Sequence, residues 1–533
     1  MSGARATTPA AGPAAGGEAL SPATATSQVG IVDLGSNTAR LVVFSYDPPS
    51  WFRLTDSIRE RVRLAAGMGE DGRLRPDAVE RALAALQLFA DYAEGAGLDR
   101  VDVVATSAVR DAVNGGDLVR RIEALGMPVR VLSGAQEAEL GVIAVANGFP
   151  WPDAWVVDLG GGSVQVSQMR ERRFASGRAH PLGAVRLTER YFGLGGDGSA
   201  PPTAKQVARL EAEIARHLEA DGRALRGDAD PLVALGGTAR SLAAAAQKAD
   251  RYPLDLLHGY RLERAALEDL TGRLLSKTVA ERAAIAGINP DRADLILAGA
   301  LVLRWLLRHG ERDHLVISGD GVREGALFQH LLPPPHLLDD VRAFASRNLF
   351  RHYAQPAAHT EAVRRLSTEL FDGLQPLHGL GPAERELLQH AALLHDIGMT
   401  VSYYRHHRHG AFLIENSGLA GFSHREIALL ALIVRGHRKG GLGAGALAPL
   451  LDPGDLERLR ALAVCLRIAE HLERSRSGKI RSVRVEVRKR AVRLLLVAPS
   501  RPTVEIWEAE KDARIFDGVF GRRLEIEHLD AGG

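Results

Sequence analysis

The chain has little cysteine: among its 533 residues only Cys465 occurs, so no intrachain disulfide can form. Cys465 lies in the apolar run 461–468, where a buried core thiol is its simplest role. A fold without disulfides fits a reducing compartment, and we predict a cytoplasmic location.

The chain also lacks an excess of charge of either sign. Its 67 Lys and Arg residues nearly balance 65 Asp and Glu residues, for a net charge of +2. No global field therefore favours a nucleic acid or an anionic membrane, and we predict neither as a partner. Any affinity for anions must come from local clusters of cationic groups.

Long apolar runs are missing as well. The most apolar stretches, 293–307 and 427–434, are short or interrupted by arginine, so no membrane span is predicted. Residues 1–27 are rich in Ala, Thr, Pro and Gly and lack a basic start followed by an apolar block. We expect a disordered tail there rather than a signal peptide.

The chain is too long for one hydrophobic core, and its texture changes along its length. Strand and helix patterns alternate up to a run of three prolines at 333–335, which is typical of α/β architecture. Helical spacing and many histidines follow, and then β-type alternation. The predicted order is a tail (1–27), two α/β lobes (28–140 and 141–329), an all-α domain (336–478) and a small α+β unit (479–530).

Two short segments have matching patterns. Residues 30–43 read G-I-V-D-L-G-S-N-T-A-R-L-V-V, and residues 155–167 read W-V-V-D-L-G-G-G-S-V-Q-V-S. Each is an apolar strand, then Asp-Leu-Gly, a turn of small residues and a second strand. Asp33 and Asp158 would end the first strands, where a carboxylate can hold Mg²⁺. The small turn residues would let backbone N–H groups approach phosphate oxygens.

One such hairpin could simply be a turn capped by its own aspartate. Two matched copies favour a shared metal and phosphate site, in which facing hairpins hold a phosphate chain from both sides. The predicted phosphate-binding residues are Gly35, Ser36, Asn37 and Thr38 in the first turn and Gly160, Gly161, Gly162 and Ser163 in the second.

Three further features are ambiguous from sequence alone. Gly236, Gly237 and Thr238 lie between a strand and a helix, where they could bind an anion or allow tight packing. Arg110 could bind phosphate or pair with a nearby aspartate. Glu137 comes directly after a capping-box pattern, in the first turn of the expected helix, and its carboxylate could interact favourably with the helix dipole. As a general base it would need burial or nearby negative charge to raise its pKa.

Taken in order, several motifs resemble the exopolyphosphatase and guanosine pentaphosphate phosphatase (Ppx/GppA) family. They are D-L-G-S-N-T from Asp33, A-T-x-x-x-R ending at Arg110, S-G-x-x-E-A with Glu137, D-L-G-G-G-S from Asp158, and A-L-G-G-T ending at Thr238. The resemblance covers about 29–328. It implies the duplicated lobe of actin, sugar kinases and heat-shock chaperones.

The resemblance also implies functional roles. Phosphate oxygens would lie on the two loops, Mg²⁺ would be held near Asp33 and Asp158, and Glu137 would deprotonate a water that attacks the terminal phosphoryl group. One departure stands out: the family usually has Thr-Glu after the Gly-Gly-Gly-Ser turn, whereas this chain has Val164-Gln165. An amide replaces a carboxylate there, and metal binding or water positioning would change.

The histidine-rich part resembles the HD domain that longer family members carry. His359 begins a helical run, and His395-Asp396 lies in A-L-L-H-D-I-G. Glu470 occupies the late position where HD hydrolases usually have aspartate. The resemblance implies a divalent metal site at these four residues, while a basic lining for a polyanion remains an alternative reading of the histidines.

The sequence therefore predicts an exopolyphosphatase that removes terminal phosphate from inorganic polyphosphate. Hydrolysis of guanosine pentaphosphate is the alternative at the same site. Two other classes remain open: an HD-domain phosphohydrolase, and a non-catalytic polyphosphate-binding regulator, which Gln165 would mark. The resemblance further implies a homodimer.

Overall fold

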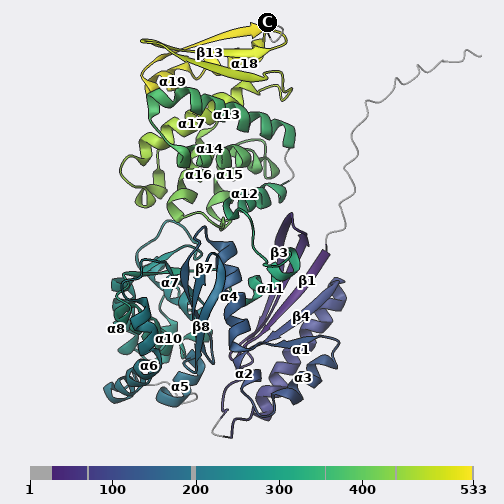
Figure 1. The fold of residues 1–533 in the computed structure, drawn as a ribbon, viewed down its shortest axis with the longest axis vertical. Coiled ribbons are helices and arrows are strands. Elements are labelled where there is room, and N and C mark those ends of the chain that lie inside the picture. Colours follow the sequence, from purple (N-terminus) through teal and green to yellow (C-terminus); the bar gives the residue numbers. More distant parts are fainter. Residues whose placement is uncertain (1–26, 69–70, 194–199, 354–355, 439–440, 531–533) are drawn as a thin grey trace, which may run out of the picture.

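The computed structural model describes residues 27–68, 71–193, 200–353, 356–438 and 441–530 (Figure 1). Two lobes lie side by side at one end, a helical segment follows, and a small sheet lies at the other end. The predicted tail lies outside the described residues except for Ser27, which begins the first strand. None of the described helices combines the length and apolarity needed to cross a bilayer.

The first lobe is a five-stranded sheet in the order β3-β2-β1-β4-β5. The first three strands form antiparallel hairpins, and β4 and β5 add in parallel. The strands are β1 (Ser27–Leu34), β2 (Ala39–Asp47), β3 (Trp51–Glu60), β4 (Arg100–Ala105) and β5 (Val129–Val131). The helices are α1 (Pro76–Ala96), α2 (Ser107–Arg110) and α3 (Gly115–Glu123).

The second lobe repeats this strand order as β8-β7-β6-β9-β11 and adds the edge strand β10. Again a pair of hairpins is extended by parallel strands. The strands are β6 (Ala154–Leu159), β7 (Val164–Arg170), β8 (Arg173–His180), β9 (Leu232–Leu235), β10 (Arg261–Glu263) and β11 (His314–Ile317). The helices are α5 (Ala184–Phe192), α6 (Ala204–Leu225), α7 (Gly237–Ala249), α8 (Arg264–Leu275), α9 (Val279–Ala283), η1 (Pro290–Arg292) and α10 (Ile296–His309).

Two helices connect the lobes and do not respect the predicted boundaries. Helix α4 (Gly134–Gly148) runs unbroken across the boundary set at 140/141. Helix α11 (Val322–Leu331), which we counted with the second lobe, packs on the first: its Ala326 and Leu327 share a buried cluster with residues of β1 and β2 (Figure 1). The chain thus returns to the first sheet after completing the second, a crossing that local sequence patterns do not show.

The rest of the described chain is helical up to α17 and then forms a three-stranded sheet, β12-β13-β14, with two more helices. The helices are α12 (Val341–Arg351), α13 (Ala357–His378), α14 (Pro382–Leu394), η2 (Ile397–Thr400), α15 (His406–Glu415), α16 (His424–Gly436), η3 (Gly445–Leu450) and α17 (Asp455–Leu472). After them come β12 (Ser482–Val487), β13 (Ala491–Ala498), α18 (Thr503–Glu510), α19 (Ala513–Phe520) and β14 (Arg523–Asp530). One buried cluster includes both Leu366 and Leu494, so helices and C-terminal sheet share a core.

Candidate functional site

The two predicted hairpins have the same construction. In the first, Asp33 near the end of β1 lies opposite Arg40 of β2, and the Gly35 N–H donates to the Thr38 carbonyl at 3.1 Å. In the second, Asp158 of β6 lies opposite Gln165 of β7. The Gly160 N–H donates to the Ser163 carbonyl at 3.0 Å. The sequence match therefore reflects a match in three dimensions.

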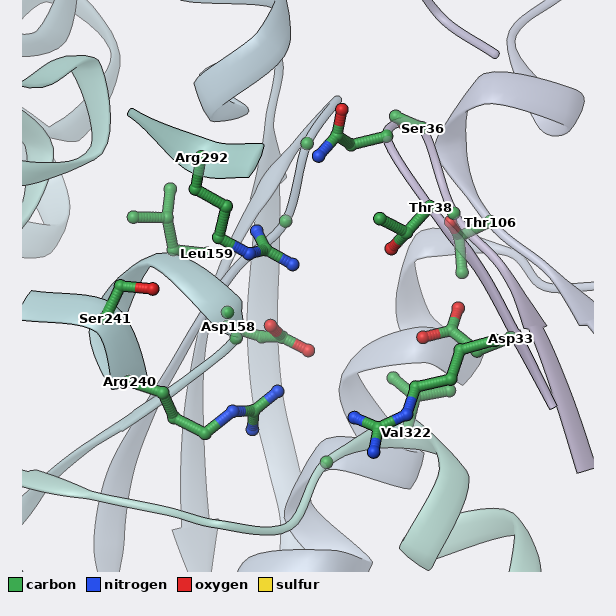
Figure 2. Close-up of a pocket in the computed structure, with 18 of the residues that line it drawn as sticks. Asp33, Ser36, Thr38, Thr106, Asp158, Leu159, Arg240, Ser241, Arg292 and Val322 are labelled. Carbon is green, nitrogen blue, oxygen red and sulfur yellow. The ribbon is translucent and has the colours of Figure 1, made fainter. Parts of the chain in front are cut away.

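The two turns meet across one cleft. A Cβ placed on Gly161 would lie 2.9 Å from the Cβ of Ser36, so only glycine allows the loops to approach this closely. Figure 2 shows the carboxylates of Asp33 and Asp158 entering the same space from opposite lobes. The duplicated hairpins thus face each other, as a site shared between two lobes requires.

A cavity of about 360 Å³ lies between the hairpins. Most of the predicted site residues line it: Asp33, Gly35, Ser36, Asn37, Thr38, Glu137, Asp158, Gly160, Gly161, Ser163, Gly236 and Gly237. The amide oxygen and nitrogen of Asn37 are both buried without a hydrogen-bond partner. Such orphaned groups indicate that a polar ligand belongs in the cavity.

Three predicted residues do not line this cavity. Gly162 packs against Ser107, and a Cβ at this position would collide with the Ser107 hydroxyl. Thr238 is buried against Gly299 in the second lobe. Arg110 turns toward Glu137 instead, and its guanidinium Nη1 donates to Glu137 Oε2 at 3.0 Å and to the Leu132 carbonyl at 2.9 Å. Arg110 therefore holds a carboxylate in place, and its Nε also bonds Asp111 at 3.2 Å.

Glu137 lies in the first turn of α4, which begins at the predicted capping box of Ser133 and Gln136. Its side chain reaches the cavity although the residue is only 6 % exposed. Burial, reinforced by the negative charge of Asp158, raises the pKa of Glu137 to about 7, against the opposing effect of Arg110. Burial thus raises the pKa of Glu137, whereas the helix dipole would lower it. A carboxylate with such a pKa suits general-base chemistry near neutrality.

The two aspartates are the groups that could hold a metal. Burial raises the pKa of Asp158 to about 6, although Arg240 opposes the shift, and burial also raises the pKa of Asp33. Carboxylates that are largely removed from solvent gain stability from a nearby cation. Hard oxygen donors are what Mg²⁺ prefers, with phosphate oxygens or water completing its shell. The donor set therefore fits Mg²⁺.

Five arginines that the sequence analysis missed also line the cavity: Arg40, Arg59, Arg240, Arg292 and Arg323. Figure 2 shows Arg240 and Arg292 reaching in on the Asp158 side. Burial lowers the pKa of Arg40 and of Arg292 to about 10, so both remain cationic at neutral pH. Two of them leave a partial signal in the sequence, since Arg40 lies within the first hairpin segment and Arg240 lies two residues after Thr238, whereas Arg59 and Arg292 lie outside every motif.

Gln165, the departure from the family pattern, is buried opposite Asp158. Its Nε2 donates to the Ser163 hydroxyl at 3.0 Å, and its Oε1 has no hydrogen-bond partner. The amide thus braces the second turn without adding negative charge beside Asp158.

The four predicted HD residues also come together, within the helical segment. Glu470 Oε2 lies 3.2 Å from Nε2 of both His359 and His395, and Asp396 Oδ2 lies 3.6 Å from His359 Nε2. All four side chains are at most 8 % exposed. Burial alone would lower the pKa of His395, but Asp396 and Glu470 outweigh it and raise that pKa to about 9.

Models of known protein families match two parts of this chain. Residues 42–333 match the Ppx/GppA phosphatase family, and residues 341–501 match the model of Ppx/GppA phosphatase domain III. An HD-type module is therefore not shown, and the four-residue metal site stays a prediction. We refer to residues 341–501 as domain III.

Solved structures of the family resemble the lobes. An exopolyphosphatase from Cytophaga hutchinsonii is 24 % identical, with a TM-score of 0.52, over 57 % of this chain and 97 % of that one. An exopolyphosphatase-like protein is 26 % identical, with a TM-score of 0.50, over 57 % and 98 %. An Aquifex aeolicus family member is 27 % identical, with a TM-score of 0.48, over 57 % and 97 %. The first two matches confirm the actin-like α/β lobes, and the family model over residues 42–333 shows that the chain belongs to the Ppx/GppA phosphatase family.

Proposed function

We propose that the cleft hydrolyses the terminal phosphoanhydride bond of inorganic polyphosphate. The observation that carries this proposal is Glu137, a buried carboxylate with a pKa near 7 in the same cavity as Asp33 and Asp158. A phosphatase needs a base for water and positive charge for the phosphoryl oxygens. Both occur together here.

In the proposed reaction Glu137 takes a proton from water, whose oxygen attacks the terminal phosphorus. The P–O–P bond breaks, orthophosphate is released, and the shortened chain leaves as the anion. Arg110 orients Glu137, while arginines and backbone N–H groups of the two turns bind the phosphoryl oxygens. Mg²⁺ held by Asp33 and Asp158 would supply further charge neutralisation.

The lining of the cavity supports the choice of polyphosphate over guanosine pentaphosphate in this proposal. Among the described residues that line it there are five arginines and no Phe, Tyr or Trp on which a guanine could stack. A chain of phosphates matches a lining of guanidinium groups, because each arginine can bind phosphate oxygens in a forked geometry. Guanosine pentaphosphate remains the alternative substrate, since its terminal phosphate needs the same groups.

The decisive experiment measures phosphate release from polyphosphate and from guanosine pentaphosphate in parallel, with Mg²⁺ and after chelation. We expect a higher kcat/KM for polyphosphate and loss of release in Glu137→Gln. Tight binding of polyphosphate without turnover would instead identify a regulator. Release that persists in Glu137→Gln but is lost in Asp396→Ala would move hydrolysis to domain III.

Domain III offers a second candidate function, divalent metal binding by His359, His395, Asp396 and Glu470. The specific observation is that Nε2 of His395, Oδ1 of Asp396 and Oε2 of Glu470 are buried without hydrogen-bond partners.

The proposed homodimer is tested by light scattering during size-exclusion chromatography, and the proposed cytoplasmic location by cell fractionation.

A further inference from the structure

A second and larger cavity lies at the opposite end of the second lobe from the cleft. Its volume is about 720 Å³, against about 360 Å³ for the cleft. Leu232 at the start of β9 and His314 at the start of β11 line it, whereas Gly236, directly after β9, lines the cleft. Because β9 and β11 are parallel, the two cavities lie at opposite ends of the same strands. The second cavity is therefore separate from the phosphate-binding turns.

This second cavity lies between two domains. Residues 421–423 and Glu426 of domain III form one side of it. Most of its remaining lining comes from three loops of the second lobe, at 149–151 before β6, 227–231 before β9 and 310–313 before β11. A cavity of several hundred Å³ at a domain boundary is typical of sites for small ligands.

Three aromatic rings form a continuous stack that ends at this cavity. The ring centroids of His258 and Phe149 are 4.4 Å apart, with 14° between the planes, and those of Phe149 and Trp151 are 4.8 Å apart, with 6°. Phe149 and Trp151 line the cavity, and Trp151 is partly exposed. Among the described residues no further ring stacks on Trp151. A planar aromatic ligand can therefore extend the stack.

Arg312 brings two unpaired hydrogen-bond donors to the wall of the same cavity. Its side chain is 12 % exposed, and its Nη1 donates to the Asp230 carbonyl at 3.0 Å. Its Nε and Nη2 have no hydrogen-bond partner, since Asp228 Oδ1 lies 3.9 Å from Nη2. These two N–H groups lie on one edge of the guanidinium and fit two adjacent acceptors. Unpaired donors of this kind indicate a ligand that accepts hydrogen bonds.

The charges around the second cavity disfavour a ligand with several negative charges. Among the described residues, five carboxylates line it: Asp228, Asp230, Glu311, Asp313 and Glu426. Only two guanidinium groups, those of Arg261 and Arg312, line it with them. Arg170 and Arg342, which pair with three of these carboxylates, do not line the cavity. A phosphate chain would lie closest to carboxylates and would be repelled.

The two acceptors that fit Arg312 must therefore belong to an uncharged group on a planar ring. A carbonyl oxygen next to a ring nitrogen provides such a pair. The O6 and N7 atoms of a 6-oxopurine have this arrangement, and arginine binds them with both donors of one edge.

We propose that the second cavity binds the base of a 6-oxopurine nucleoside that carries no phosphate. The base stacks on Trp151, and its O6 and N7 accept hydrogen bonds from Arg312. This site differs from the cleft in its position and in its ligand, and it does not depend on the proposed hydrolysis. Guanosine pentaphosphate, the alternative substrate of the cleft, is too highly charged for it.

The test measures binding of inosine to the full chain by isothermal titration calorimetry. We expect one inosine per chain and about tenfold weaker binding of adenosine, because its 6-amino group donates where the 6-oxo group accepts. Arg312→Lys keeps the charge but loses the paired donors, and Trp151→Leu removes the end of the stack. Each should weaken inosine binding about tenfold. The control Arg308→Lys changes an arginine that pairs with Glu268 away from the cavity and should bind inosine normally.

Absence of inosine binding, or equal affinity for inosine and adenosine, would overturn the proposal. Unchanged affinity in both Arg312→Lys and Trp151→Leu would also refute it. Circular dichroism shows whether each variant is folded, and the comparison of the two nucleosides with the unaltered chain is decisive if a variant is not. Polyphosphate should not displace inosine; displacement would place the nucleoside in the cleft and contradict a separate site. Glu137→Gln should abolish phosphate release and retain inosine binding, which separates the two proposals.

Discussion

Replacing Glu137 with glutamine should destroy activity and at the same time stabilise the folded protein. Loss of the general base is expected to lower kcat by about 10²–10⁴-fold. The stabilisation follows from burial, because the carboxylate is ionised at pH 8 in a site that strongly favours its neutral form. Glutamine has nearly the same shape and carries no charge.

The magnitude follows from the pKa of Glu137, which rises from 4.5 to about 7 on folding. At about 1.36 kcal/mol per pKa unit, the ionised form costs the native state about 3 kcal/mol. Below pH 4.5 both states are protonated and the cost vanishes. Between pH 4.5 and 7 the unfolded chain loses its proton first, so the stability of the unaltered protein falls as the pH rises, and above pH 7 the cost is complete.

The assay compares chemical denaturation of the two proteins from pH 4.5 to 8.5, alongside phosphate release. The stability of Glu137→Gln should match the unaltered protein near pH 4.5 and exceed it by about 3 kcal/mol above pH 7. Glu139→Gln is the matched control, because Glu139 is exposed on the same helix and should change neither property. A pH-independent difference, or retained activity, would refute the assigned environment and role of Glu137.

Three further substitutions test other parts of the molecule. Gln165→Glu places a carboxylate opposite Asp158 and should lower the Mg²⁺ concentration for half-maximal activity about tenfold; an unchanged or higher concentration contradicts this. Arg240→Ala removes a guanidinium that lines the cleft and should raise KM for polyphosphate at least tenfold, which an unchanged KM refutes. Arg476→Gln removes the group that competes for Asp396 and should tighten Mn²⁺ binding to domain III about tenfold, which weaker binding would contradict.

Local patterns predicted the elements well where a short segment determines its own structure. Strand β9 (Leu232–Leu235) ends directly before Gly236, where a strand was predicted, and the capping box of Ser133 and Gln136 starts α4. The paired hairpins were predictable because the pattern occurs twice. The role of Arg110 was not, since its distance to Glu137 depends on how β4 and β5 pair, and either a phosphate or an acidic neighbour was compatible with its sequence context.

The sequence did not show which distant segments come together in the fold, or which side chains they bury. Arg59 and Arg292 reach the cavity from β3 and η1, which no motif connects. The pKa of Glu137 depends on burial by segments far away in sequence, so the choice between helix cap and base could not be made from residues 133–140. Helix α11 packs on the first sheet although it follows the last strand of the second. Hydrophobic periodicity shows only that the helix has an apolar face, and it does not show which lobe that face covers.

The same helix that holds Glu137 also connects the cleft to domain III. At its other end the Gly148 carbonyl accepts from the Gly421 N–H of domain III at 2.9 Å and from His258 Nε2 at 3.0 Å. The His258 carbonyl in turn lies 2.9 Å from Nε2 of His424, the first residue of α16. Helix α4 is continuous from Gly134 to Gly148, so a single element joins these contacts to the end that carries Glu137. The contacts with domain III therefore help to fix the position of the helix on which the proposed base lies.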